Sequence, residues 1–118
     1  MITSLHHVRI AMPPEREDMA REFYSDILGL EEHSPDDGSL AGTLLFRIGE
    51  QYLEIASEEA FVPAHSVYPV LAVRDLDTLS ATLEERMFAL DWGEPEGSER
   101  RCFVHDPFGN RLGLVERG

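Results

Sequence analysis

The side chains that could do chemistry in this sequence are imidazoles, carboxylates and guanidinium groups. The chain has five histidines and 23 acidic residues, and all ten of its basic residues are arginine. Imidazole and carboxylate ligands together suit divalent ions such as Mn²⁺, Fe²⁺ and Ni²⁺. A chain without lysine cannot perform Schiff-base chemistry by itself. Cys102, the one cysteine, rules out an internal disulfide, and its place on an expected strand favours a position in the core.

The acidic balance limits the partners this chain can have. Its net charge of −13 over 118 residues argues against nucleic acid and against an anionic membrane, because both are bound by lysine and arginine. The charge fits either solubility or the attraction of a cationic ligand. No apolar run approaches the ~20 residues that span a bilayer, and the N-terminus has no secretory signal pattern. We therefore expect a cytoplasmic protein with a small-molecule partner.

The histidine, carboxylate and arginine side chains must be positioned by secondary structure, which begins with a strand and a helix. In the first half of the chain, periodicity and turn residues predict five elements, at Leu5–Ala11 (strand), Glu15–Leu28 (helix), Glu31–Ser34, Thr43–Ile48 and Gln51–Ala56 (strands). Gly29 is expected to cap the helix in the left-handed conformation, and Pro35–Gly38 has the composition of a turn.

The second half repeats this order after a polar linker, Ser57–His65. Asp75 is suited to cap the N-terminus of a helix. The predicted elements are Ser66–Val73 (strand), Leu76–Met87 (helix), Ala89–Trp92, Arg101–His105 and Arg111–Glu116 (strands).

This internal repeat is the main indication of the fold. A strand, a helix and three strands occur once in residues 1–58 and again in residues 66–118. We predict one α+β domain over residues 1–118, with two βαβββ modules that form a curled mixed sheet and helices on its outer face. The other face of the sheet would then form a cup.

Three motifs follow one another in this arrangement, and a fourth, weaker one opens the second helix. They are Leu5-His6-His7-Val8-Arg9-Ile10, Phe23-Tyr24-Ser25-Asp26-Ile27-Leu28-Gly29-Leu30, Asp106-Pro107-Phe108-Gly109-Asn110-Arg111 and Asp75-Leu76-Asp77. Through these motifs the chain resembles the vicinal-oxygen-chelate superfamily, which includes glyoxalases, bleomycin resistance proteins and extradiol dioxygenases. The resemblance covers nearly the whole chain and implies the fold more strongly than the reaction.

The resemblance implies a metal site with four ligands on the cup face, two from each module. It places His7 and Glu54 at the positions of the first module, and Tyr68 and Gly113 at those of the second. His7 and Glu54 would hold one divalent ion of Mn, Fe, Ni or Zn, and Glu54 and Tyr68 would be the catalytic groups. Gly113 has no side chain and Tyr68 is an unusual ligand, so the implied site is half present.

A second imidazole for such a site would have to come from another histidine. His6 adjoins His7, so strand alternation points it the other way. His65 lies just before a strand, and His105 lies at a strand end. The alternative is that no metal binds, and that His7 and Glu54 form hydrogen bonds inside a polar pocket.

Strand alternation gives a second, independent set of cup residues. Positions two or four apart from the four family positions are Leu5, Arg9, Ala11, Tyr52, Ala56, Val70, Ala72, Arg111 and Val115. The opposite faces are uniformly apolar, as packing against helices requires: Val8, Ile10, Leu53, Ile55, Leu71, Val73, Leu112 and Leu114. We predict that Arg9, Tyr52 and Arg111 bind substrate. A guanidinium fork suits a carboxylate, phosphate or enolate oxygen, although each arginine could instead pair with Glu54 or a surface acid.

Three functions remain open at this stage. The first is a metal-dependent lyase, isomerase or dioxygenase acting on a small oxygen-rich molecule, with the metal as Lewis acid. The second is a metal-free binding protein of the drug-sequestering kind. The third is a scaffold whose cup is filled by its own side chains. The resemblance also implies a homodimer.

Overall fold

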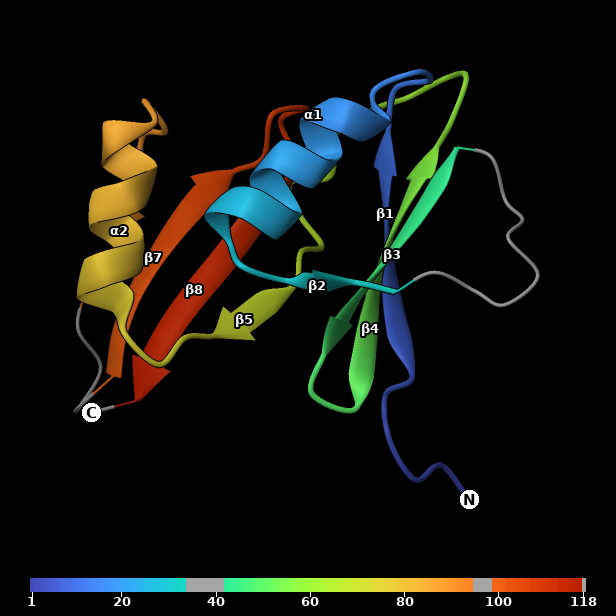
Figure 1. Ribbon diagram of the computed structural model, residues 1–118. Coiled ribbons are helices and arrows are strands. Elements are labelled where there is room, and N and C mark those ends of the chain that lie inside the picture. Colours follow the sequence, from blue (N-terminus) through green and yellow to red (C-terminus); the bar gives the residue numbers. More distant parts are fainter. Residues whose placement is uncertain (34–41, 95–98, 118) are drawn as a thin grey trace. The chain divides into compact units, whose positions relative to one another are not determined.

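The computed structural model describes residues 1–33, 42–94 and 99–117, so the predicted turn Pro35–Gly38 lies outside the described residues. The chain forms two compact units, residues 1–63 (unit 1) and residues 64–118 (unit 2), each with its own sheet (Figure 1). None of the helices in the described residues is long and apolar enough to cross a membrane.

Unit 1 contains one helical segment and one four-stranded mixed sheet. The strands lie in the order β1-β4-β3-β2, with β1 and β4 parallel and the other pairs antiparallel. The elements are β1 (His7–Met12), α1 (Glu17–Arg21), η1 (Glu22–Ile27), β2 (Glu31–Glu32), β3 (Thr43–Ile48) and β4 (Gln51–Ser57).

Unit 2 repeats this topology. Its strands lie in the order β5-β8-β7-β6, again with one parallel pair, β5 and β8, and two antiparallel pairs. The elements are β5 (Val70–Ala72), α2 (Leu76–Glu85), β6 (Asp91–Trp92), β7 (Glu99–His105) and β8 (Arg111–Arg117). The predicted α+β class and the two βαβββ modules are therefore confirmed.

The predicted alternation of apolar and polar faces is also confirmed along the central strands. Buried side chains recur at every second position in β4, β7 and β8, in the second half of β1 and in the middle of β3. These buried residues are Ile10, Met12, Leu44, Phe46, Leu53, Ile55, Cys102, Val104, Leu112 and Leu114. The opposite face carries polar side chains such as Arg9, Glu54 and Arg111 among small or apolar residues, of which Ala56 and Gly113 are themselves buried.

The first helix differs from its prediction. It begins at Glu17 rather than Glu15, because Glu15 has a positive φ of 62°, which is outside the helical region. After Arg21 the helix widens into the π-helical segment η1, where the Leu28 amide donates to the carbonyl of Phe23, five residues back, at 2.9 Å. An apolar stripe at helical spacing does not distinguish these two hydrogen-bond patterns.

The end of η1 follows its prediction. Gly29 has a φ of 79°, and its amide donates to the Ser25 carbonyl at 3.1 Å. This bond satisfies a carbonyl that the helix leaves without a partner, as a left-handed cap does.

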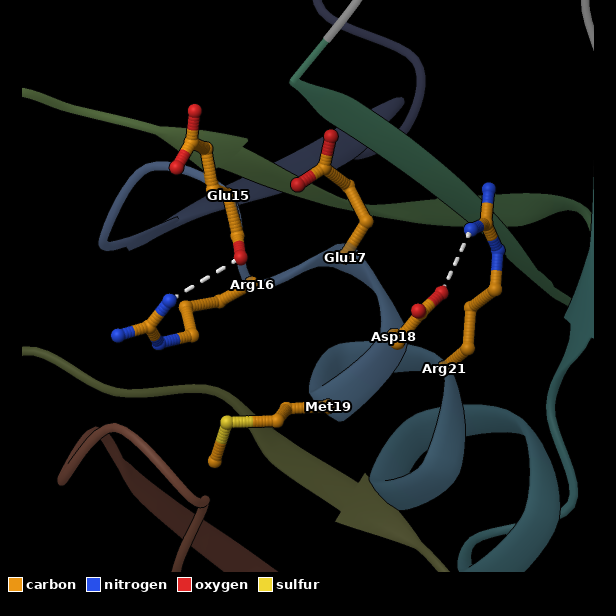
Figure 2. A pocket seen from close by; sticks show the side chains of 6 residues that line it. All are labelled: Glu15, Arg16, Glu17, Asp18, Met19 and Arg21. Atoms are coloured by element: carbon orange, nitrogen blue, oxygen red, sulfur yellow. Dashed lines mark hydrogen bonds and ion pairs between the residues drawn. The ribbon is translucent and has the colours of Figure 1, made fainter.

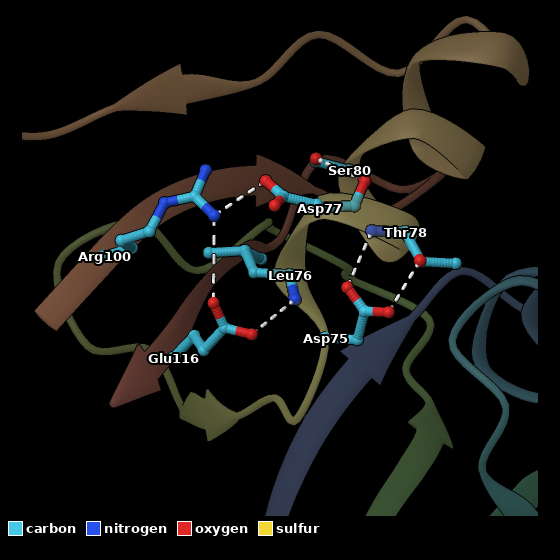
Figure 3. Close-up of polar contacts among 7 residues, drawn as sticks. All are labelled: Asp75, Leu76, Asp77, Thr78, Ser80, Arg100 and Glu116. Carbon is cyan, nitrogen blue, oxygen red and sulfur yellow. Dashed lines mark hydrogen bonds and ion pairs between the residues drawn. The ribbon is translucent and has the colours of Figure 1, made fainter. Parts of the chain in front are cut away.

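The second helix begins at its predicted cap. Asp75 accepts hydrogen bonds from the Thr78 amide at 3.1 Å and from the Thr78 hydroxyl at 2.7 Å (Figure 3). These bonds satisfy one amide of the first turn, and they lower the pKa of the Asp75 carboxyl because they favour its charged form.

A second carboxylate holds the same end of α2 to β8. Glu116 accepts a hydrogen bond from the Leu76 amide at 3.0 Å and lies 3.7 Å from Nη1 of Arg100 (Figure 3). The same Nη1 donates to Asp77 at 2.6 Å, and this bond raises the pKa of Arg100. The helix is thereby attached to its sheet at a defined position.

The turn between β7 and β8 is a structural motif. The buried Asp106 accepts hydrogen bonds from the amides of Phe108 and Asn110 and from the Asn110 side chain, at 2.8–3.0 Å. Asn110 in turn accepts from the Ala64 amide at 3.0 Å. The left-handed φ of 93° at Gly109 completes the turn. The motif that carried the resemblance here stabilises the fold.

One strand of unit 2 is shorter than predicted. The strand Ser66–Val73 is reduced to Val70–Ala72, because Pro69 has no amide hydrogen to donate to a ladder. Tyr68 therefore lies just before β5 rather than within it.

Candidate functional site

The polar face of unit 1 is built on the parallel pair β1 and β4. In this register His7 pairs with Tyr52 and Arg9 pairs with Glu54. Nε2 of His7 lies 3.7 Å from one Glu54 oxygen, and Nη1 of Arg9 lies 3.4 Å from the other. Glu54 is therefore shared between a guanidinium and an imidazole. Pairing of Arg9 with Glu54 was one of the two alternatives expected for this arginine. Its side chain is 20% exposed, so the cluster remains open to solvent.

The neighbouring His6 does not follow strand alternation. Strand β1 begins only at His7, and the Nδ1 atoms of the two histidines lie 2.9 Å apart. The expectation that His6 points away from His7 was therefore wrong. The ring of Tyr52 lies 5.9 Å from that of His6 and 5.4 Å from that of His33. The sequence did not single out His33, since its place depends on how β2 pairs with β3.

The corresponding face of unit 2 carries a guanidinium among aromatic rings. The Arg111 guanidinium carbon lies 4.0 Å from the ring centre of Phe103 and 5.0 Å from that of Tyr68. The two rings meet edge to face, with centres 5.4 Å apart. Cation–π contact with both rings fixes the guanidinium on this face. The sequence alone does not bring Phe103 to this site, because its contact with Arg111 depends on the register of β7 and β8.

Glu54 and Gly113 occupy equivalent places in their sheets. Glu54 lies between Arg9 on β1 and Leu45 on β3. Gly113 lies between Val70 on β5 and Phe103 on β7. The two strand registers therefore match, and unit 2 has a glycine where unit 1 has a carboxylate.

The space beside Gly113 is filled by its neighbours. A Cβ atom at this position would lie 3.0 Å from Cγ2 of Val70 and 3.4 Å from Cε1 of Phe103. The first of these distances is shorter than ordinary contact, so Val70 would have to shift to admit any side chain. Unit 2 therefore lacks a ligand here, and Val70 would have to move by a few tenths of an ångström to admit one.

The residues present do not fit a metal centre. Among the described residues, no three histidine, cysteine, aspartate or glutamate side chains are grouped to hold a metal ion. His7 and Glu54 offer two donors, and Arg9 competes for the carboxylate. Of the alternative histidines, Nε2 of His65 lies 3.1 Å from the Gly109 carbonyl, and its ring contacts that of His105 with centres 5.7 Å apart. These residues offer too few ligands to hold a metal ion tightly.

A pocket elsewhere on unit 1 is unrelated to these residues. It is lined by the segment that enters α1: Glu15, Arg16, Glu17, Asp18, Met19 and Arg21 (Figure 2). Both of its arginines are already engaged, since Arg16 donates to the Glu15 carbonyl at 3.2 Å and Arg21 lies 3.7 Å from Asp18. None of the predicted site residues lines it.

Comparison with known proteins identifies the family. No protein-family model matches the sequence, and no curated protein matches it. A solved structure from Bacillus anthracis, described as a glyoxalase family protein, is 30% identical to this chain, with a TM-score of 0.91. The match covers 100% of this chain and 98% of that one. This chain belongs to the glyoxalase family. The predicted vicinal-oxygen-chelate relationship is thereby confirmed.

More distant structures share the fold of this glyoxalase family protein. TnmS3, an antibiotic binding protein from Streptomyces sp. CB03234, is 22% identical over 99% of this chain and 98% of its own, with a TM-score of 0.73. FosX, a fosfomycin resistance protein from Listeria monocytogenes, is 16% identical over 100% of this chain and 96% of its own, with a TM-score of 0.79. Sequence identities this low establish a shared fold, and the activities of these proteins do not carry over to this chain.

Proposed function

We propose that this glyoxalase family protein binds a small oxygen-rich molecule through its own side chains, without a metal ion. The observation that carries the proposal is the filled space at Gly113, where a carboxylate ligand would have to stand. The polar groups of the two sheet faces are otherwise mainly donors: the guanidinium groups of Arg9 and Arg111, and the imidazole of His7. Such groups suit the oxygen atoms of an anion.

In unit 1 the proposed role of Glu54 is to orient donors. With Arg9 at 3.4 Å and His7 at 3.7 Å, its carboxylate holds both groups on the exposed face of β1. An anionic ligand could then exchange places with Glu54 on Arg9, while Tyr52 offers an aromatic surface two residues away along β4. TnmS3, which is named as an antibiotic binding protein, shows that this fold can serve a binding role.

A metal-dependent enzyme is the second candidate. It is favoured by one distance, since Nε2 of His7 and Oε2 of Glu54 are 3.7 Å apart and both could contact one ion. In that case the earlier prediction of Glu54 and Tyr68 as catalytic groups would apply, and the reaction would be that of a lyase, isomerase or dioxygenase.

The homodimer also remains a prediction, which light scattering on the purified protein would check.

Elemental analysis of the purified, untagged protein separates the two candidates. Mn, Fe, Co, Ni and Zn are measured per chain as purified, after dialysis against a chelator, and after reloading with each metal. We expect no stoichiometric metal in any of these samples. Stoichiometric metal that disappears in His7→Ala and Glu54→Ala, but stays in the control His105→Ala, would replace the binding function with the enzyme.

A further inference from the structure

Arg111 differs from other arginines of this chain in its partners. Arg9, Arg21, Arg100 and Arg101 each lie within 4 Å of a carboxylate. Within the part of the chain that the structure describes, the partners of the Arg111 guanidinium are two aromatic rings instead. In a chain of net charge −13, a guanidinium that is not paired with a carboxylate is available to bind an anion from outside.

One donor of this guanidinium has no acceptor. Nε of Arg111 is buried and makes no hydrogen bond to any described residue. Buried donors in native proteins are nearly always paired, since an unpaired one loses its hydration without compensation. A carboxylate that binds side-on and displaces the atoms covering Nε would supply the missing acceptor, because Nε–H and one Nη–H point in the same direction and match the two carboxylate oxygens.

The surface next to Arg111 is apolar. Residue 113, two positions along β8 and on the same face, is a buried glycine that the side chains of Val70 and Phe103 cover. Val70, which is 48% exposed, and the ring of Phe103 flank this glycine on the neighbouring strands. A ligand whose carboxylate meets Arg111 would therefore place the rest of its structure on Val70 and Phe103.

We infer that this face of unit 2 binds a planar aromatic carboxylate, with the carboxylate on Arg111 and the ring on Val70 and Phe103. The inference rests on the proposed function and names its ligand class. Planarity is required because a flat ring can stack on the Phe103 ring, whereas a puckered ring cannot. The negative charge is required because the guanidinium has no carboxylate partner among the described residues.

The test is an NMR titration of the full-length ¹⁵N-labelled protein with three probes of similar size. Benzoate is planar and anionic, cyclohexanecarboxylate is anionic but not planar, and benzamide is planar but neutral. The readout is the Nε–Hε signal of Arg111, assigned by its disappearance in Arg111→Lys. We expect benzoate to shift this signal to saturation and to bind about tenfold more tightly than either other probe.

Two variants and one control test the residues. Arg111→Lys keeps the charge and loses the fork, so benzoate affinity should fall about tenfold or more. Phe103→Leu keeps the approximate volume and should remove the preference for benzoate over cyclohexanecarboxylate. Arg74→Lys makes the same substitution at an exposed arginine of the same unit and should change nothing.

The outcomes separate this inference from the function on which it rests. An Arg111 signal that benzoate does not move, or equal binding of all three probes, would overturn the inference. Benzoate binding that is lost in Arg9→Lys and kept in Arg111→Lys would overturn it too, while leaving a metal-free binding protein. Stoichiometric metal in the elemental analysis would refute the proposed function, whereas benzoate bound at Arg111 would still support this ligand class.

Discussion

Val70 and Gly113 pair directly across the ladder between β5 and β8, and the valine methyl groups cover the glycine. The pair explains why unit 2 differs from unit 1 at equivalent strand positions. Glu54 in unit 1 has Arg9 as its cross-strand neighbour and can hold a charge there. In unit 2 the neighbour of Gly113 is Val70. Its methyl groups lie in the space that a carboxylate side chain at position 113 would need.

Gly113→Glu is therefore expected to destabilise the protein. The added side chain must displace Val70, and overpacking of this kind costs about 1–3 kcal/mol. The cost should be smaller in a Val70→Ala background, which removes the two nearest methyl groups. Urea denaturation of the four proteins of this double-mutant cycle measures the coupling. Gly93→Glu is the control, because a Cβ at Gly93 meets nothing within 4 Å; equal losses at both glycines would contradict the packing argument.

Met87 offers a stabilising substitution. It ends α2 with a φ of 71°, its amide donates to Glu84, and the Phe88 amide donates to Leu83 at 2.9 Å. These two bonds form a Schellman motif, whose left-handed position favours glycine. Met87 is 90% exposed, so little packing would be lost. Met87→Gly should raise the free energy of unfolding by about 1 kcal/mol.

The neighbouring residue is a matched control for this substitution. Arg86 has a φ of −89°, which suits any side chain, so Arg86→Gly should lower stability in the same thermal or urea melts. If both glycine variants shifted the melting temperature in the same direction, the left-handed backbone at Met87 would not be the cause.

The fold could be predicted from the sequence where local patterns decide the structure. Strand β3 has its predicted bounds, and Asp75 and Gly29 cap their helices as expected. The misses have physical causes that a pattern does not contain. Pro69 shortened β5, and the wider hydrogen-bond spacing of η1 leaves the same apolar stripe as an α-helix would.

The candidate site could be predicted only in part, because it depends on register. Alternation placed Arg9 and Glu54 on one face of their sheet and Arg111 on the face of Gly113, and the paired strands have this arrangement. The contact of Phe103 with Arg111 requires the exact alignment of β7 with β8. The rule of alternation also failed for His6, which precedes the strand.

Cys102 is expected to be chemically inert in the native protein. The residue is fully buried, and burial raises the pKa of its thiol, so the reactive thiolate is scarce at neutral pH. Its reaction with a disulfide reagent should be at least ~100-fold slower in buffer than in urea, since it must await opening of the structure. Absorbance of the released thiol follows the reaction. In the control, Cys102→Ala with Ser66→Cys at an exposed position, both rates should be similar; a fast native reaction at Cys102 would show that β7 opens readily.

Asp75 should make the stability of α2 depend on pH. Hydrogen bonds from Thr78 lower the pKa of this carboxyl, so its contribution is complete above the unfolded pKa of about 4 and is lost as pH falls through the folded pKa. Asp75→Asn retains a capping oxygen but does not titrate. The difference in urea midpoint between wild type and this variant should therefore shrink between about pH 4 and pH 2.

In Thr78→Val, ¹³C NMR titration of Asp75 should give a higher pKa than in wild type, because the hydroxyl donor is gone. A midpoint difference that is constant over this range, with an unchanged titration in Thr78→Val, would mean that Asp75 does not act through these bonds.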